Sequence, residues 1–114
     1  MADSPEASRR KRVAQLNDQF RTTGSGGRMV MTLGVQSLGS DIIAKVMKAI
    51  REFNDFNADN DPHGEHDFGE FETEGYRFFF KIDYHAPGLE YGSEDPTNPE
   101  KTMRVLTIML PEEY

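Results

Sequence analysis

The chain has 114 residues, and its length predicts a single domain. The formal net charge of -7 disfavours a protein whose whole surface attracts nucleic acid or anionic lipid. The absence of cysteine excludes disulfides, thiol catalysis and zinc–thiolate sites. No apolar run approaches the roughly 20 residues of a membrane span, and no secretory signal is recognisable. We therefore expect a cytoplasmic protein with no membrane partner.

Charge is divided unevenly along the chain. Residues 1–51 hold nine Lys/Arg against four Asp/Glu, a net of +5, and residues 52–114 hold four against sixteen, a net of -12. This asymmetry indicates one cationic and one strongly anionic region. The alternative is that neighbouring charges partly neutralise each other in the folded protein.

The first predicted helix runs over residues 5–22. Ser4 suits the N-cap, Pro5 suits the first helical position, and the glycines at 24–27 end the helix. A narrow apolar stripe is formed by Val13, Leu16 and Phe20. Because the stripe begins late, residues 1–12 are expected to be a flexible basic segment or the start of the helix, and residues 13–114 a single α+β domain.

The remaining pattern predicts a strand over 28–33, a helix capped by Ser40, a polar loop over 54–67, and strands over 67–72, 76–84 and 103–110. The last strand is apolar at nearly every position, which is typical of a central strand. The expected fold is α+β, with two helices packed on a four-stranded, mostly antiparallel sheet in the order α-β-α-β-β-β.

A two-residue turn at Glu74-Gly75 sets the register of the predicted hairpin. Paired positions then sum to 149, so that Phe71 faces Phe78, Phe68 faces Lys81 and His66 faces Asp83. This register puts Phe71, Phe78, Phe80 and Ile82 on one face, which we expect to be the core face. Phe68 and Phe79 are expected on the other face.

The same register gathers polar groups around His66 and Asp83, with Glu65 and Asp67 in the adjoining loop. In one interpretation His66 and Asp83 form a structural hydrogen bond that anchors the loop to the sheet. In a second, His66, Asp67 and Asp83 bind a divalent metal ion that activates water. In a third, Asp83 orients His66 for acid–base work.

One cationic cluster stands near the N-terminus and comprises Arg9, Arg10, Lys11 and Arg12. It could bind nucleic-acid phosphates or an acidic protein surface, or it could be a solvated start of the helix. No aromatic residue is interleaved to read bases. Direct nucleic-acid binding therefore ranks below protein binding.

Several segments resemble a bacterial family, the domain of unknown function 3768. They are LND at 16–18, TGSGGR at 23–28, NDPHGEHDFG at 60–69, KIDY at 81–84 and LTIMLPEEY at 106–114. The resemblance implies a short stand-alone bacterial protein of a kind often associated with plasmids or other mobile DNA. It confers no activity.

The leading functional hypothesis is a small, acidic, non-enzymatic binding or regulatory protein. Its anionic surface would dock a basic protein surface, such as that of a nucleic-acid-processing enzyme inhibited in the manner of anti-restriction or anti-CRISPR proteins. No cofactor is expected. The candidate binding residues are Asp59, Asp61, Glu65, His66, Asp67, Lys81 and Asp83. The alternative is a small metal-dependent hydrolase or nuclease that uses His66, Asp67 and Asp83.

Overall fold

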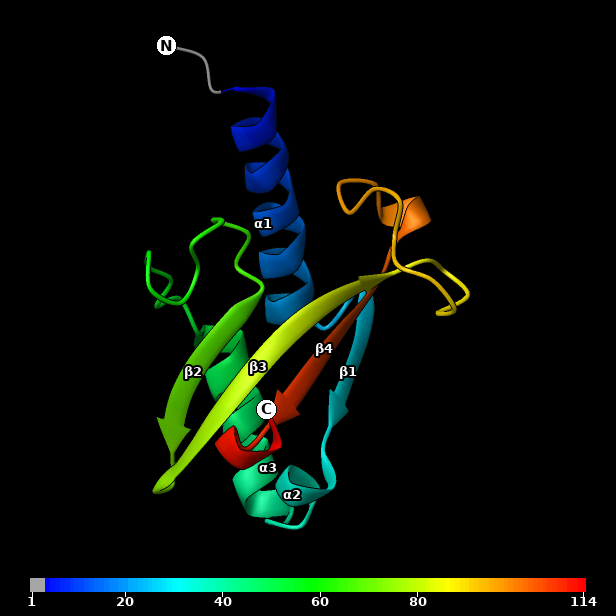
Figure 1. Ribbon diagram of the computed structural model, residues 1–114. Coiled ribbons are helices and arrows are strands. Elements are labelled where there is room, and N and C mark those ends of the chain that lie inside the picture. The colour runs from blue at the N-terminus through cyan, green and yellow to red at the C-terminus, as the bar shows by residue number, and fades with distance from the viewer. Residues whose placement is uncertain (1–3) are drawn as a thin grey trace.

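The computed structural model describes residues 4–114 and shows an α+β fold in which helices pack on one face of a four-stranded sheet (Figure 1). The α-helices are α1 (Pro5–Thr23), α2 (Leu33–Gln36) and α3 (Ser40–Glu52), and the strands are β1 (Gly27–Met31), β2 (Phe68–Thr73), β3 (Tyr76–His85) and β4 (Met103–Met109). Two short 3-10 helices, η1 (Pro99–Lys101) and η2 (Pro111–Glu113), flank β4. The α+β class predicted from the sequence is confirmed.

Two details differ from the predicted architecture. The sheet is mixed, because β4 lies between β1 and β3 and is parallel to β1 but antiparallel to β3. A third helix, α2, follows β1 directly, where the sequence indicated strand as far as Leu33. The Thr32 hydroxyl accepts a hydrogen bond from the Val35 amide, and this side-chain cap starts the helical turn.

Helix α1 forms as the sequence predicts and extends one residue further. The Ser4 hydroxyl accepts from the Ala7 amide at 3.0 Å, and Gly24 ends the helix in the left-handed region at φ 77°. Residues 5–12 are helical, and Figure 1 shows these first turns extending past the end of the sheet. Residues 1–3 of the predicted basic segment lie outside the described residues.

Helix α3 buries Val46 and Ile50 completely, so these two residues lie on its inner face. The predicted cap is wrong, because Ser40 is the first helical residue and Gly39 takes the cap position. At Gly39 φ is 93°, a conformation that strains side-chain-bearing residues. No helix within residues 4–114 has both the length and the apolar composition needed to cross a membrane.

The β2–β3 hairpin has the predicted register, with Phe71 opposite Phe78 and Phe68 opposite Lys81. The turn residues Glu74 and Gly75 have φ of 55° and 81°, as a type I′ turn requires. Hydrophobic burial and turn chemistry therefore specify the same pairing.

The predicted core face is confirmed. Phe78 and Phe80 are fully buried and Ile82 is 4% exposed, while Phe71 packs at the edge of this core. The opposite face of the sheet carries a smaller aromatic group. On it, the rings of Phe68 and Phe79 lie 5.7 and 5.5 Å from the ring of Tyr114.

Candidate functional site

His66 is held by helix α1 and by its own loop. Its Nδ1 lies 2.9 Å from a carboxylate oxygen of Asp18 in α1, and its Nε2 lies 3.7 Å from Asp61. The imidazole stacks on Phe56, with ring centroids 4.1 Å apart. One carboxylate lies near each ring nitrogen, so the two together fix the orientation of the imidazole.

The expected pairing of His66 with Asp83 is not formed. The ladder of the hairpin ends at Phe68 and Lys81, and the backbone at His66 has φ 57°, which breaks the alternation on which the expectation depended. His66 therefore contacts α1, whereas Asp83 lies on the opposite face of the sheet, 3.2 Å from Lys81. His66 does contact another element through a carboxylate, as the anchor interpretation expected, but the carboxylate is that of Asp18 in α1 and not that of Asp83.

Asn17 is the centre of a buried polar network next to His66. It is fully buried, and its Nδ2 donates to the Glu65 carbonyl at 2.9 Å and to the Tyr84 hydroxyl at 2.8 Å. Its Oδ1 accepts from Arg104 Nε at 2.7 Å. The Tyr84 hydroxyl in turn donates to the Glu65 carboxylate. This network joins α1, the 54–67 loop, β3 and β4.

Burial sets the protonation of these groups. It raises the pKa of the Tyr84 hydroxyl far above the ordinary value of 10.0, so this group remains a donor. Burial, followed by the nearby charge of Glu65, also raises the pKa of the Asp67 carboxyl. Burial lowers the pKa of the Arg104 guanidinium, which is only 2% exposed.

The acidic loop, residues 54–67, is ordered by its own side chains. The Asp61 carboxylate, 4% exposed, accepts from the backbone amides of Glu65 and His66. We expected Asp61 on a binding surface; it is buried because it caps this turn.

The tip of the acidic loop is a second hydrogen-bonded turn. Asn57 Oδ1 accepts from the Asp59 amide at 2.9 Å, and Asn60 Nδ2 donates to the Asp55 carbonyl at 2.7 Å. The side chains of Asp55 and Asp59 remain exposed. The loop thus presents these two carboxylates from a fixed backbone.

Lys81 and Asp83 lie apart from the acidic loop, on the sheet face away from the helices. They line a shallow hollow of about 600 Å³ together with Thr107, Tyr114 and Glu113. The seven predicted binding residues therefore form two groups. Asp59, Asp61, Glu65, His66 and Asp67 belong to the acidic loop, and Lys81 and Asp83 belong to the open face of the sheet.

The predicted metal ligands are not brought together. Asp83 is on the opposite face of the sheet from His66, and Asp67 contributes its backbone carbonyl to the Ile82 amide at 2.8 Å. Within residues 4–114, no three His, Asp or Glu side chains converge in a way that could hold a metal ion.

The acidic C-terminus closes over the start of α2. The Glu113 carboxylate accepts from the Thr32 hydroxyl at 2.6 Å, from the Leu110 amide at 2.8 Å and from the Gly34 amide at 3.2 Å. The Thr32 hydrogen bond is the main cause of the lowered pKa of the Glu113 carboxyl. This residue therefore links the last turn of the chain to the β1–α2 junction.

We predict that Glu113 makes the stability of the protein sensitive to acid. Since folding lowers this pKa below 4.5, the contribution is complete above pH 4.5 and is lost as pH falls through the lower folded value. Melting curves of wild type and Glu113→Ala should differ at neutral pH and converge in acid. A difference that persists unchanged into strong acid would contradict this assignment.

The predicted cationic cluster lies on the part of α1 that extends past the sheet. Arg10 is paired with Glu6 at 2.5 Å, while Arg9 and Arg12 are exposed. Arg9 contributes to the lowered pKa of Asp95, and Arg12 lies near enough to Arg104 to help lower its pKa. Glu6 and Asp95 thus offset part of the charge of Arg10 and Arg9, whereas Arg12 adds to the positive charge near Arg104.

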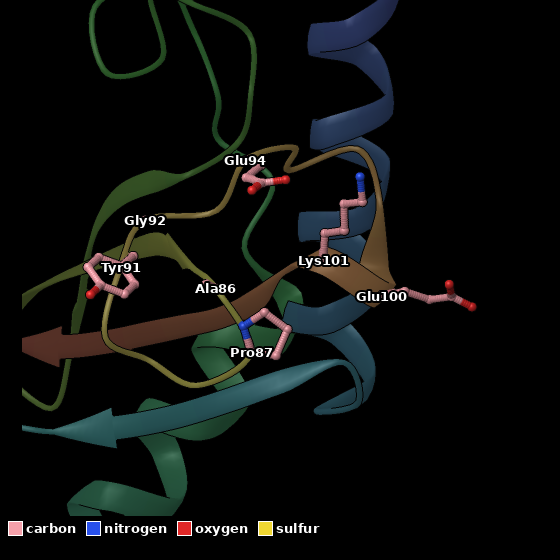
Figure 2. A pocket seen from close by; sticks show the side chains of 7 residues that line it. All are labelled: Ala86, Pro87, Tyr91, Gly92, Glu94, Glu100 and Lys101. Atoms are coloured by element: carbon pink, nitrogen blue, oxygen red, sulfur yellow. The ribbon is translucent and has the colours of Figure 1, made fainter.

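A separate hollow of about 380 Å³ lies in the loop between β3 and β4. Figure 2 shows Tyr91 at one end, Lys101 at the other, and Glu100 pointing away from it. None of its lining residues belongs to the sites predicted from the sequence.

Sequence reasoning missed Asn17, Asp18 and Tyr84, the three residues that hold the acidic loop against the helix and sheet. One signal was present in the sequence. Asn17 is a polar residue inside the apolar stripe of α1, four residues after Val13 and three before Phe20. A polar residue on a buried helix face must find a hydrogen-bonding partner.

The fold and site define a small α+β protein whose polar residues brace an acidic loop between a helix and a sheet. The family described as "Protein of unknown function (DUF3768)" matches residues 31–113, and the chain belongs to this family. The match contains GEHDFG and KIDY, while LND and TGSGGR precede it. Comparison with curated proteins gives no match, and neither does comparison with solved structures.

Proposed function

We propose that this chain is a small, non-enzymatic binding protein that docks its acidic loop on a basic surface of a partner protein. The observation that supports this most strongly is that one loop carboxylate is buried and holds the loop, while two others are exposed. The Asp61 side chain is buried, and it accepts hydrogen bonds from backbone amides of the loop. The side chains of Asp55 and Asp59 are exposed, and hydrogen bonds within the loop hold the backbone that carries them. Glu52, at the end of α3, is also exposed and extends the acidic surface.

The contacts that hold the acidic loop against the rest of the protein should strengthen its binding to a partner. A loop that is already ordered loses less conformational entropy when it docks than a flexible acidic segment would. Stacking of Phe56 on His66, and the position of the Arg21 guanidinium over the Phe56 ring at 5.4 Å, hold the loop from its core side. Its exposed carboxylates can then steer a cationic partner by charge.

The partner we infer is a nucleic-acid-processing enzyme with a cationic groove. Residues 52–114 carry a net charge of -12, which lets this half of the chain compete for a surface that otherwise binds phosphates. An inhibitor of the anti-restriction or anti-CRISPR type, carried by a mobile element, would act in this way.

The alternative function, a metal-dependent hydrolase or nuclease, receives less support from the geometry. It requires His66, Asp67 and Asp83 around one ion, whereas His66 and Asp83 lie on different faces of the sheet. Nucleic-acid binding through Arg9–Arg12 is also less favoured, since Glu6 and Asp95 lie close to this cluster.

Charge reversal tests the docking surface. We predict that Asp55→Lys combined with Asp59→Lys lowers capture of the partner by about tenfold or more, because steering by complementary charge raises association rates by this order. The control, Glu90→Lys with Glu94→Lys, makes the same change in net charge in the β3–β4 loop, where both residues are exposed.

The measurement is capture of proteins from an extract of the source cell by each immobilised variant, at low and high salt. A partner held by wild type and by the control, released by salt and lost by the loop variant, is the expected result. Equal capture by the loop variant, or capture indifferent to salt, would refute docking through this loop.

A further inference from the structure

Within residues 4–114, one side of the β1 backbone is not paired with another strand. The sheet order places β1 at an edge, with β4 as its neighbour (Figure 1). The Thr32 amide donates to the Ile108 carbonyl at 3.1 Å, so by alternation the backbone groups of Arg28 and Val30 also face β4. Those of Met29 and Met31 must face outward. The Gln36 side chain donates to the Met31 carbonyl, which agrees with this direction.

The two edges of the sheet are protected differently. Edge strand β2 carries the exposed carboxylates Glu70 and Glu72, and α3 packs against it. Edge strand β1 is contacted by the four-residue helix α2, carries one charged residue, Arg28, and leaves Val30 42% exposed. Charges, prolines and covering helices are the usual means of preventing edge-to-edge pairing. Edge β1 is therefore the one suited to pair with another strand.

We propose that two copies of this chain pair their β1 strands antiparallel, about a two-fold axis at Met29. The Met29 backbone would exchange both N–H···O bonds with Met29 of the second copy, joining the two sheets into one. In this register Arg28 of each copy lies opposite Val30 of the other. Both side chains are exposed in the single chain, on the sheet face away from the helices.

The distribution of charge favours a second copy as the occupant of this edge. The acidic loop and the carboxylates of β2 are at the opposite edge of the sheet from β1 (Figure 1). Antiparallel pairing places these surfaces at the two outer ends of the joined sheet, where their repulsion is weakest. It also places the basic starts of the two α1 helices at opposite ends of the joint. The acidic loops remain free, so this inference does not depend on the proposed docking function.

The register predicts a charge-specific response at position 30. Val30→Lys would place a lysine opposite Arg28 of the second copy at two equivalent positions, and like charges directly opposite destabilise a strand pair. Adding Arg28→Glu to Val30→Lys would restore opposite charges across the joint. The control is Tyr76→Lys, a similar change at 43% exposure in β3, away from β1.

Light scattering during size exclusion, over a range of concentrations, measures the mass of each variant, and circular dichroism confirms its fold. We expect twice the chain mass of 13.0 kDa for wild type, the control and the double variant, and the single-chain mass for Val30→Lys. A wild type that is monomeric at every concentration would overturn the proposal. So would a dimer that survives Val30→Lys, or a folded double variant that stays monomeric.

Discussion

Phe80→Ala should destabilise the protein by about 3–5 kcal/mol, the usual range for removal of a fully buried aromatic ring. Phe80 has no exposed surface, and its ring meets that of Phe53 edge-on at 5.2 Å. It lies opposite Gly69, where an added Cβ would be 2.3 Å from the Phe80 ring. The glycine thus makes the space that the ring fills, and alanine at position 80 would leave a cavity there.

Urea unfolding of Phe80→Ala and of the neighbouring Phe79→Ala tests this expectation. Phe79 is partly exposed on the other face of the sheet, so its truncation should cost clearly less. A domain of this size is stable by roughly 5–15 kcal/mol, so a loss of about 3–5 kcal/mol leaves Phe80→Ala only marginally folded where the wild-type stability is at the low end of that range. Equal losses for the two variants would show that the core does not lie on the assigned face.

The second large effect is expected from Asn17→Leu, which keeps the side-chain size and removes the hydrogen bonds. The substitution leaves Arg104 Nε and the Glu65 carbonyl without their Asn17 partner. Each buried polar group orphaned in this way costs about 1–3 kcal/mol. Gln15→Leu, at an exposed position of the same helix, should change stability by less than about 0.5 kcal/mol.

Urea unfolding again provides the measurement for this pair. Asn17→Leu should lower the midpoint well below that of wild type and of Gln15→Leu. If Asn17→Leu were as stable as wild type, the polar network would not be what joins α1 to the sheet.

Local patterns in the sequence were sufficient to predict the hairpin and its core face. The turn Glu74-Gly75 fixes a two-residue loop, and the alternation from Phe78 to Ile82 allows one register only. The capping of α1 at Ser4 and Gly24 was equally local. These features require neighbours that are close in the sequence, which is why they could be predicted.

The errors arose where distant segments meet or where the backbone leaves regular geometry. The parallel pairing of β1 with β4 joins residues more than seventy positions apart, and no local signal states it. The partner of His66 was misassigned because strand alternation was extended through a residue at φ 57°. Asp61 looked like one more surface carboxylate, yet it caps the turn of its own loop.

Amide hydrogen exchange of the 54–67 loop tests the central structural claim, which is that His66 and Asp18 hold the acidic loop in place. His66→Ala should accelerate exchange of the backbone amides at positions 65 and 66. The control, His63→Ala, changes an exposed residue of the same loop and should not accelerate it. The amides of β3 and β4 should exchange alike in both variants. Unchanged protection of the loop in His66→Ala would contradict the account.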